Sequence, residues 1–266
     1  MGQMSMTTAL VTGASTGIGA VFADKLAARG HDLVLVARSQ DKLEAIAQDL
    51  SQRYNVAAVA IAQDLTTADA AAHLFTQLEQ RGITVEVLVN NAGFGTYGEF
   101  GEGDLGTYLN MIQLNITVLV DLTYRCLQGM QARRSGSILN ISSTAAFQPI
   151  PYLGVYAATK AFVLSFSEAL WYECKPYNVK VLGVCPGPTA TEFFKTAAFP
   201  DTMQESMGQS YVTPEEVVTT ALKALDDGHS NVVTGGLNNQ LLVNAGRFMP
   251  REMLTSAVGR MFKGNA

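Results

Sequence analysis

The chain has 266 residues, 48% of them hydrophobic, and a formal net charge of −5 at pH 7. This length and composition allow one large buried core, so we expect a single domain spanning residues 1–266. The acidic balance argues against a nucleic-acid partner, because binding a phosphate backbone requires a concentrated basic face. No apolar run approaches the ~20 residues that crossing a bilayer requires, so no membrane span is expected.

The first residues and the cysteines indicate the cellular compartment in which the protein is expected. Residues 1–6, a short N-terminal extension, lack the basic region and apolar core of a signal peptide, and each of their three methionines is a candidate start. The cysteines are odd in number and lie in apolar segments, which is typical of buried free thiols in a reducing compartment: Cys126, Cys174 and Cys185. Neither the cysteines nor the scattered histidines form a metal-ligand set. We therefore expect a cytoplasmic protein without a metal.

Short, continuous apolar runs recur along the chain, as expected for strands buried on both faces of a parallel sheet. They occupy residues 9–11, 33–36, 56–61, 87–89, 138–141, 179–184 and 232–233. Helical stretches separate them, and two have clear start signals: Thr66 with Asp69 three residues later, and the capping box with proline at 213–216. This alternation predicts an α/β fold, a doubly wound sheet of about seven parallel strands with helices on both faces.

A glycine-rich turn directly follows the first expected strand. Residues 12–19 read Thr-Gly-Ala-Ser-Thr-Gly-Ile-Gly and open a helix expected at 20–28. Glycines here permit a tight turn and a close backbone approach to a pyrophosphate, while the helix N-terminus offers free N–H groups to the anion. The turn predicts dinucleotide contacts from Gly13, Ser15, Thr16, Gly17, Ile18 and Gly19.

The residues at the end of the second expected strand indicate whether the chain binds NAD or NADP. A carboxylate there binds the ribose diol of NAD, but residues 36–39 read Val-Ala-Arg-Ser. The Arg38 guanidinium suits a 2′-phosphate, so NADP(H) is expected. Ser39 either donates to that phosphate or caps the next helix, and the two roles are compatible.

Three side chains point to proton-transfer chemistry. Tyr156 and Lys160 lie one helical turn apart, and Ser143 follows the apolar run 137–141. A cation beside a phenol stabilises the phenolate, so we expect Lys160 to lower the pKa of Tyr156, the general acid/base. Ser143, at the carboxyl end of a strand, would polarise the substrate oxygen.

These motifs, together with Asp64-Leu65, residues 90–93 (Asn-Asn-Ala-Gly), Asn115 and Pro186-Gly187, occur in the order and spacing of the short-chain dehydrogenase/reductase family. The chain resembles that family over nearly all of its length. The resemblance implies a single-domain Rossmann fold with strand order 3-2-1-4-5-6-7. The spacing between the tyrosine and the lysine resembles that of the carbonyl and alcohol enzymes rather than the enoyl reductases.

The same resemblance assigns roles to further residues. It implies that Asn115 is a fourth catalytic residue, which anchors water for a proton relay, and that Lys160 also holds the nicotinamide ribose. The remaining cofactor contacts that it implies are Asp64 and Leu65 near the adenine, Asn90, Ala92 and Gly93 beside the adenosine ribose, and Pro186, Gly187, Thr189 and Thr191 at the nicotinamide.

The substrate side is expected to be apolar. Residues 191–212 are long enough for a lid, and the candidate lining residues there and near the site are Phe94, Phe147, Phe193, Phe194 and Met203. Two readings are open: an aromatic pocket, or side chains that pack the lid onto the body.

The C-terminal extension, residues 236–266, carries an apolar helical stripe with basic neighbours. The stripe consists of Met253, Leu254, Ala257, Val258, Met261 and Phe262. It suits an anionic membrane surface, although most such stripes face a protein core, a pocket or another subunit.

We expect an NADP(H)-dependent reductase of a hydrophobic ketone or aldehyde. By the same resemblance, helices near 104–133 and 156–175 would pair in a homodimer or homotetramer. The alternatives are an NAD-dependent alcohol dehydrogenase and a non-catalytic NADP(H)-binding sensor.

Overall fold

The structure, a computed structural model, describes residues 7–208, 211–246 and 249–263. The expected N-terminal extension, residues 1–6, lies outside these ranges. The core is a seven-stranded parallel sheet in the order β3-β2-β1-β4-β5-β6-β7, which confirms the predicted fold class and strand order. The strands are β1 (Thr8–Thr12), β2 (Asp32–Ala37), β3 (Ala58–Ala62), β4 (Val85–Asn90), β5 (Gly136–Ile141), β6 (Val179–Cys185) and β7 (Asn231–Val233).

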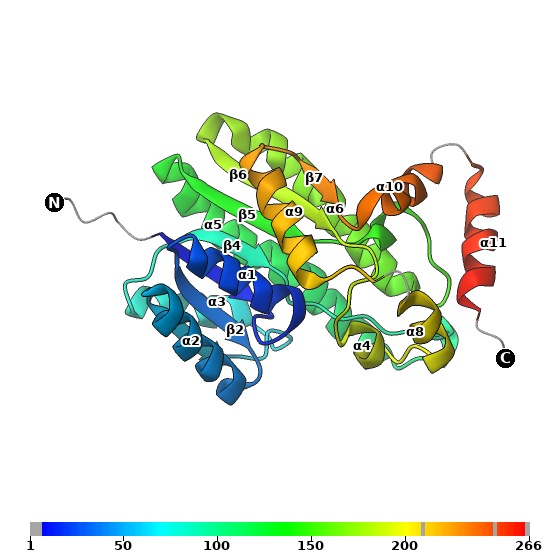
Figure 1. The fold of residues 1–266 in the computed structure, drawn as a ribbon, viewed down its shortest axis with the longest axis horizontal. Coiled ribbons are helices and arrows are strands. Elements are labelled where there is room, and N and C mark those ends of the chain that lie inside the picture. Colours follow the sequence, from blue (N-terminus) through cyan, green and yellow to red (C-terminus); the bar gives the residue numbers. More distant parts are fainter. Residues whose placement is uncertain (1–6, 209–210, 247–248, 264–266) are drawn as a thin grey trace.

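Helices cover both faces of this sheet (Figure 1). One face packs on α1 (Gly17–Ala28), α2 (Gln40–Tyr54) and α9 (Pro214–Asp226). The other packs on α3 (Ala70–Gln80), α5 (Leu119–Arg133) and α6 (Gly154–Cys174). Because both faces are covered, the strands consist of continuous apolar runs rather than of alternating apolar and polar residues.

The order of strands reverses between β1 and β4, both of which pair in the centre of the sheet. In open α/β sheets, ligands bind beyond the carboxyl ends of the strands at such a switch point. The loops after β1, β4, β5 and β6 meet at this edge and carry the predicted site residues.

Two local predictions differ from the structure. The third strand begins at Ala58, and Val56 is buried ahead of it. The helix expected at Thr66 begins four residues later, at Ala70. The Asp64 carboxylate accepts hydrogen bonds from both the backbone N–H (2.9 Å) and the hydroxyl (2.7 Å) of Thr66, and this local pairing holds residues 64–66 in a turn. The capping box at Thr213 is confirmed, since its hydroxyl accepts from the Glu216 N–H at 3.2 Å.

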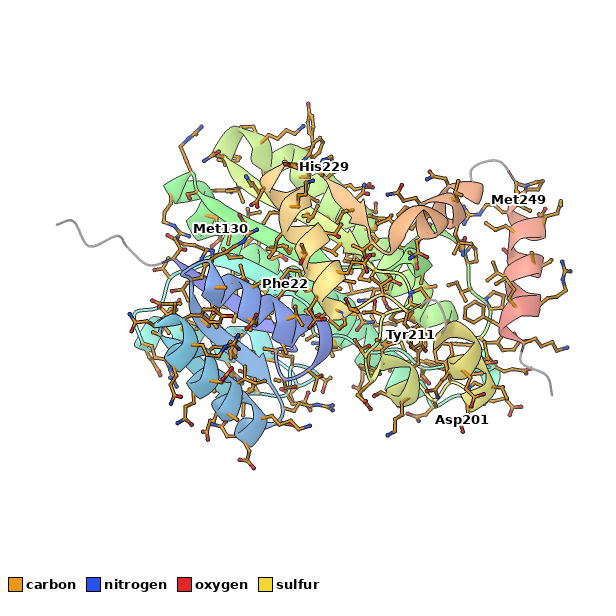
Figure 2. The ribbon with its side chains drawn as sticks, viewed as in Figure 1. Phe22, Met130, Asp201, Tyr211, His229 and Met249 are labelled. Atoms are coloured by element: carbon orange, nitrogen blue, oxygen red, sulfur yellow. The ribbon has the colours of Figure 1, made fainter. Side chains whose placement is uncertain are left out.

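Beyond β6 the chain builds a second layer over the carboxyl edge. Its helices are α7 (Phe193–Thr196), α8 (Asp201–Gly208), α10 (Gly236–Ala245) and α11 (Arg251–Phe262). Earlier in the chain, α4 (Leu105–Ile112) and the π-helical turn η2 (Gln113–Val118) precede α5. Short 3₁₀ turns complete the chain: η1 (Phe100–Glu102), η3 (Thr144–Phe147) and η4 (Lys175–Tyr177). In Figure 1, α10 and α11 lie at the end of the molecule opposite the N-terminal side. In Figure 2, Phe22 and Met130 lie in the sheet layers, whereas Tyr211 and Met249 lie on the α8 and α11 side.

Candidate active site

The glycine turn has the geometry of an anion site. Gly13 (φ 64°) and Gly17 (φ 56°) adopt left-handed backbone conformations. At Gly19 an added Cβ would lie 2.2 Å from the Gly13 carbonyl oxygen, so no side chain fits there. Thr16, at the N-cap of α1, makes no side-chain cap bond. The first N–H groups of α1 therefore have no side-chain cap and can bind an anion.

Two residues that the sequence reading assigned no role hold this turn against the loop after β4. The Thr12 hydroxyl accepts from the backbone N–H groups of Asn91 and Ala92, each at 3.0 Å. The Asn91 amide donates to the Thr12 and Gly13 carbonyls at 3.0 and 3.1 Å. Their place in the motifs at 12–19 and 90–93 was the only available signal, because these bonds join segments far apart in sequence. They set Ala92 and Gly93 beside the glycine turn.

The side chain of Asn90 does not face the predicted cofactor site. It is 4% exposed and donates to the Thr123 hydroxyl and to the Asn140 amide oxygen, both at 2.9 Å. Asn140 in turn donates to the Ser167 hydroxyl on α6 at 3.0 Å. The side chain of Asn90 is therefore engaged inside the protein, and the contact of this residue with the ribose stays a prediction. Asn90 ends β4 on the face that packs against α5 and α6, and only its backbone remains for a ligand.

Arg38 and Asp64 end two adjacent strands, as predicted. Both side chains are exposed, and the positive charge of Arg38 contributes to a lowered pKa of Asp64, after the larger effect of the hydrogen bonds from Thr66. Ser39 occupies the N-cap position of α2, but its hydroxyl makes no cap bond, so it is free to donate. Leu65 is 4% exposed and its side chain packs in the core, so its contact with the adenine, which stays a prediction, would come from the backbone.

The loop after β6 crosses to the glycine turn. A Cβ on Gly17 would lie 3.0 Å from Cγ2 of Thr191, which places these two predicted cofactor residues side by side. The Thr189 hydroxyl donates to the Gly187 carbonyl at 2.9 Å, within the turn that Pro186 begins. Asn239 on α10 closes over Gly187, where a Cβ would lie 2.1 Å from its Nδ2. No sequence signal pointed to Asn239.

Ser143, Tyr156 and Lys160 converge at the carboxyl ends of β5 and β6. Ser143 follows β5 in an extended conformation, and Tyr156 and Lys160 lie in the first two turns of α6. The Lys160 Nζ lies 5.7 Å from the centroid of the Tyr156 ring and donates to the Ile141 carbonyl at 2.8 Å. The three predicted groups are thus brought together.

The electrostatics differ from the prediction. Burial raises the pKa of Tyr156 to about 12, and the nearby Ser143 hydroxyl acts in the opposite direction. Burial lowers the pKa of Lys160 to about 8. The expected lowering of the Tyr156 pKa by Lys160 is therefore wrong for this arrangement: desolvation of the phenolate outweighs the cation, which lies beside the ring and binds a backbone carbonyl. Tyr156 as a residue is half-buried rather than fully buried, which limits this penalty.

Asn115 is buried in the π-helical turn η2. Its side chain accepts from the Phe94 N–H (3.1 Å) and donates to the Phe94 carbonyl (3.0 Å) and to the Thr159 hydroxyl (3.1 Å). Thr159 donates to the Tyr156 carbonyl at 2.7 Å. Asn115 therefore joins the loop after β4 to the helix of Tyr156. A π-turn disturbs the regular helical bonding and is frequent at functional sites.

Two further buried groups lie beneath Lys160. The Ser142 hydroxyl donates to the Lys160 carbonyl at 2.7 Å. The Cys185 thiol interacts with Ser142 and Lys160, and burial raises its pKa to about 12, so it is neutral at physiological pH. All three cysteines are buried and free, as predicted.

Replacing Lys160 by methionine is expected to stabilise the nucleotide-free protein at pH 7. The unfolded lysine titrates near 10.5 and the folded one near 8, so below pH 8 burial of the ammonium costs up to about 3 kcal/mol. Between pH 8 and 10.5 the unfolded chain binds more protons, so the stability of the parent rises with pH and the advantage of Lys160→Met shrinks. Urea unfolding of both proteins between pH 7 and 10.5 measures this difference in stability.

The matched control is Lys42→Met, which makes the same replacement at an exposed lysine of another helix and should leave the stability close to that of the parent. Lys160→Met also loses the hydrogen bond to the Ile141 carbonyl. This loss reduces the gain in the free energy of unfolding but does not change how that gain depends on pH. A difference in stability that stays constant from pH 7 to 10.5 would contradict the prediction.

The candidate substrate residues divide into two groups. The Phe193 ring lies 5.1 Å from the Tyr156 ring, centroid to centroid. Phe194 instead is buried, stacked on Tyr211 at 5.2 Å and edge-on to Phe199 at 5.1 Å, so it packs the layer onto the body and does not line an opening. Phe94, Phe147 and Met203 are half-buried. The side chain of Met207, which the lid segment also contributes, lies outside the described residues.

The residues fit a dinucleotide on structural grounds. The glycine turn leaves room only for backbone, α1 presents N–H groups without a side-chain cap, and Arg38 and Asp64 end the two strands beside it. These features would hold a pyrophosphate and an adenosine moiety. Within the described ranges, no three His, Cys, Asp or Glu side chains are grouped to hold a metal ion.

Residues 7–200 match the short chain dehydrogenase family. The mouse very-long-chain 3-oxoacyl-CoA reductase is 35% identical over 249 residues, which cover 92% of this chain and 76% of that one. The chain belongs to the short-chain dehydrogenase family and is an oxidoreductase of that class.

Two solved structures share the fold over nearly their whole length. A short-chain dehydrogenase from Sphingobium yanoikuyae in complex with NADPH has a TM-score of 0.80 at 32% identity, covering 98% of this chain and 97% of that one. The bulky-bulky ketone specific alcohol dehydrogenase from Comamonas testosteroni has a TM-score of 0.77 at 29% identity, covering 99% and 98%.

Proposed function

We propose that the protein uses NADP(H) to reduce the keto group of a bulky, apolar substrate, with a 3-oxoacyl thioester as the first candidate. The observation that carries the proposal is the convergence of Ser143, Tyr156 and Lys160 next to the Phe193 ring. Support for the substrate class comes from the mouse relative, named for 3-oxoacyl-CoA reduction, and from the Comamonas neighbour, named for bulky ketones.

In the proposed reaction the bound nicotinamide supplies the hydride. Ser143 and Tyr156 donate hydrogen bonds to the substrate oxygen as it gains negative charge, and Tyr156 then gives it a proton. A pKa of about 12 keeps the Tyr156 phenol protonated at neutral pH, which is the form that reduction requires. Lys160 holds the nicotinamide ribose, and Asn115 orders the path by which the phenol regains a proton.

A substrate panel tests the function. NADPH consumption is measured with 3-oxoacyl thioesters of short and long chains, aromatic ketones, and aldehydes. We expect turnover of ketones, fastest with a long apolar chain, because Phe193 and its half-buried neighbours offer apolar contact. Binding of NADPH without turnover of any carbonyl compound would favour the non-catalytic sensor instead.

Replacing Arg38 by alanine is expected to weaken NADPH binding by roughly 10- to 100-fold, the range for losing a hydrogen bond to a charged group. NADH affinity should stay nearly constant, because NADH lacks the 2′-phosphate. Titration of the intrinsic fluorescence with each nucleotide measures both. The exposed Arg81, at the end of α3, provides the control Arg81→Ala. Tighter binding of NADH than of NADPH by the parent would favour an NAD-dependent alcohol dehydrogenase.

We also propose a homodimer that pairs through α4 and α6. Apolar side chains at one face of α4 are exposed: Leu105 (65%), Leu109 (55%) and Ile112 (39%). On α6, Phe162 is 40% exposed. Contiguous apolar surface of this kind is typical of a protein interface.

A further inference from the structure

The C-terminal helix α11 is apolar on two sides. Its inner side packs Leu254 (8% exposed) and Val258 (5%) into the cluster beneath it, together with Ile150 and Leu153. Its outer side exposes Met253 (59%), and Met261 (71%) is exposed near its C-terminal end. The predicted single stripe is thus divided between the core and the surface. Exposed apolar side chains rimmed by polar residues are typical of a contact surface, so the outer side is a candidate for one.

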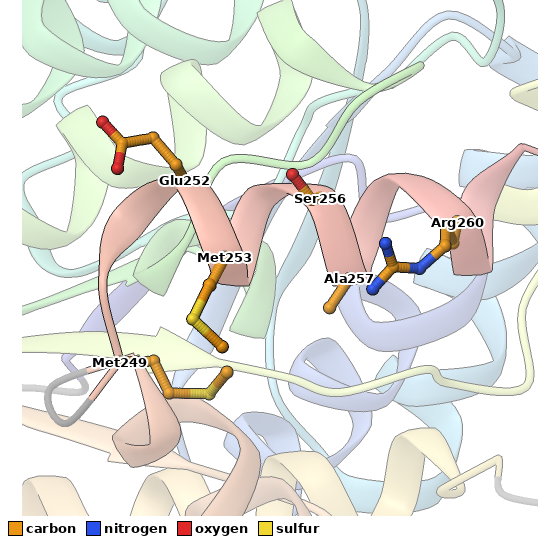
Figure 3. Close-up of a pocket in the computed structure, with 6 residues that line it drawn as sticks. All are labelled: Met249, Glu252, Met253, Ser256, Ala257 and Arg260. Carbon is orange, nitrogen blue, oxygen red and sulfur yellow. The ribbon is translucent and has the colours of Figure 1, made fainter.

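We call this outer side the α11 face and define it by Met249, Glu252, Met253, Ser256, Ala257 and Arg260, which line a hollow of about 370 Å³. In Figure 3 the Met249 and Met253 side chains are directed toward each other, and Arg260 reaches back toward Ala257. Methionine is flexible and adapts to apolar surfaces that are not rigidly shaped. The hollow is shallow and mixed in polarity, as expected of a docking surface rather than an enclosed ligand site.

Charge distinguishes this part of the chain from the rest. Residues 236–266 contain four of the 18 basic residues and one of the 23 acidic residues, a formal charge of +3. Residues 1–235 hold the other 14 basic and 22 acidic residues and carry −8. On α11 and its end, Arg251, Arg260 and Lys263 are exposed. A basic, apolar surface on an acidic protein complements an anionic partner.

We propose that the α11 face docks on an anionic lipid surface, with α11 lying flat along it. The methionines would enter the boundary between head groups and acyl chains, and Arg260 and Lys263 would meet lipid phosphates. None of the helices in the described ranges combines the length and apolarity needed to cross a bilayer, so contact is peripheral. A second copy of the chain is the competing occupant, and self-association tests it.

Docking here would orient the substrate side of the active site. The inner side of α11 lies in the same cluster as Phe194, Phe199 and the partly buried Phe193 and Tyr156. The Tyr97 hydroxyl donates to the Phe262 carbonyl, and the Tyr97 N–H donates to the Ala197 carbonyl at 2.8 Å. Tyr97 thus ties α11 to the layer that carries Phe193. An apolar substrate dissolved in the lipid would then reach the site from the docked side.

Vesicle cosedimentation tests the proposal on the full chain. We use vesicles of phosphatidylcholine alone and of phosphatidylcholine with phosphatidylserine, at low and physiological salt. The parent should bind the anionic vesicles, bind the neutral ones weakly, and dissociate as salt rises. The double variant Arg260→Glu, Lys263→Glu should lose at least roughly tenfold in affinity, as expected from removing the attraction of two basic residues. Met253→Ser with Met261→Ser should weaken binding at every salt concentration.

Matched controls distinguish a loss of docking from a loss of folding or from a general change in the charge of the protein. Lys42→Glu with Arg81→Glu makes the same charge change on exposed residues of other helices and should bind anionic vesicles as the parent does. Circular dichroism and NADPH titration check that each variant is folded. Equal binding to neutral and anionic vesicles, or parent-like binding by the Arg260/Lys263 variant, overturns the proposal. The proposal is also overturned if the parent binds no lipid but self-associates in analytical ultracentrifugation, and Met253→Ser with Met261→Ser abolishes that self-association. A second copy would then cover the face.

Discussion

Replacing Tyr156 by phenylalanine is expected to lower kcat for NADPH-dependent ketone reduction by about 10²–10⁴, the range for losing a positioned general acid. The variant keeps the ring, its 5.1 Å contact with Phe193 and its place near Lys160, and loses only the hydroxyl that we propose as the proton donor. NADPH affinity should change little, because the Lys160 ammonium and the glycine turn are untouched. Steady-state kinetics with the best ketone of the panel, together with nucleotide titration, measure both quantities.

Tyr152→Phe is the matched control, since Tyr152 lies one turn before Tyr156 in sequence and contacts the Tyr97 ring at 6.0 Å. It should retain kcat within a few-fold. A Tyr156→Phe enzyme with parent-like kcat would falsify the assignment of the proton donor. The pH profile adds a second reading: reduction should persist across neutral pH, because burial keeps the phenol protonated up to a pKa of about 12.

Replacing Gly19 by alanine is expected to weaken NADPH binding by at least roughly tenfold and to destabilise the fold by about 1–3 kcal/mol, the usual cost of overpacking. The added methyl would lie 2.2 Å from the Gly13 carbonyl oxygen and 2.5 Å from the Asn91 amide nitrogen. Neither neighbour can yield without moving the turn or breaking the Asn91 bonds to the Thr12 and Gly13 carbonyls. Thermal unfolding and nucleotide titration report the two effects separately.

Gly101→Ala serves as the control, because a Cβ there meets no atom within 4 Å. It should match the parent in both measurements. If Gly19→Ala bound NADPH as tightly as the parent, the turn would not be the pyrophosphate site, and the cofactor assignment would need another location.

The strands and the glycine turn were predictable because their signals are local. Continuous apolar runs identify strands covered on both faces, and β3 differed only at its start. Gly13 and Gly17 have the left-handed conformations that their motif predicts. The helix start at Thr66 failed for a local reason too: the Asp64 carboxylate accepts from the Thr66 N–H, which the predicted capping box would give to Asp69, and from the Thr66 hydroxyl.

At the site, the sequence did not indicate which way side chains point or what surrounds them. Asn90 ends a strand as expected, yet the side chain faces α5 and α6 rather than the ligand edge. Phe193 and Phe194 are adjacent in sequence, but one contacts the Tyr156 ring and the other is buried. Which side of a short helix faces a ligand depends on what packs against it, and sequence spacing does not contain that information.

By itself the sequence determined the fold class, the strand order through its family resemblance, and the residues that we propose for the active site. Only the tertiary structure decided the protonation energetics of Tyr156 and Lys160, the bonds of Thr12, Asn91 and Asn115, and the division of the α11 stripe between core and surface. The physical reason is the same in each case. Desolvation and hydrogen bonding depend on neighbours that are distant in the chain, and those neighbours are defined only once the layers have packed.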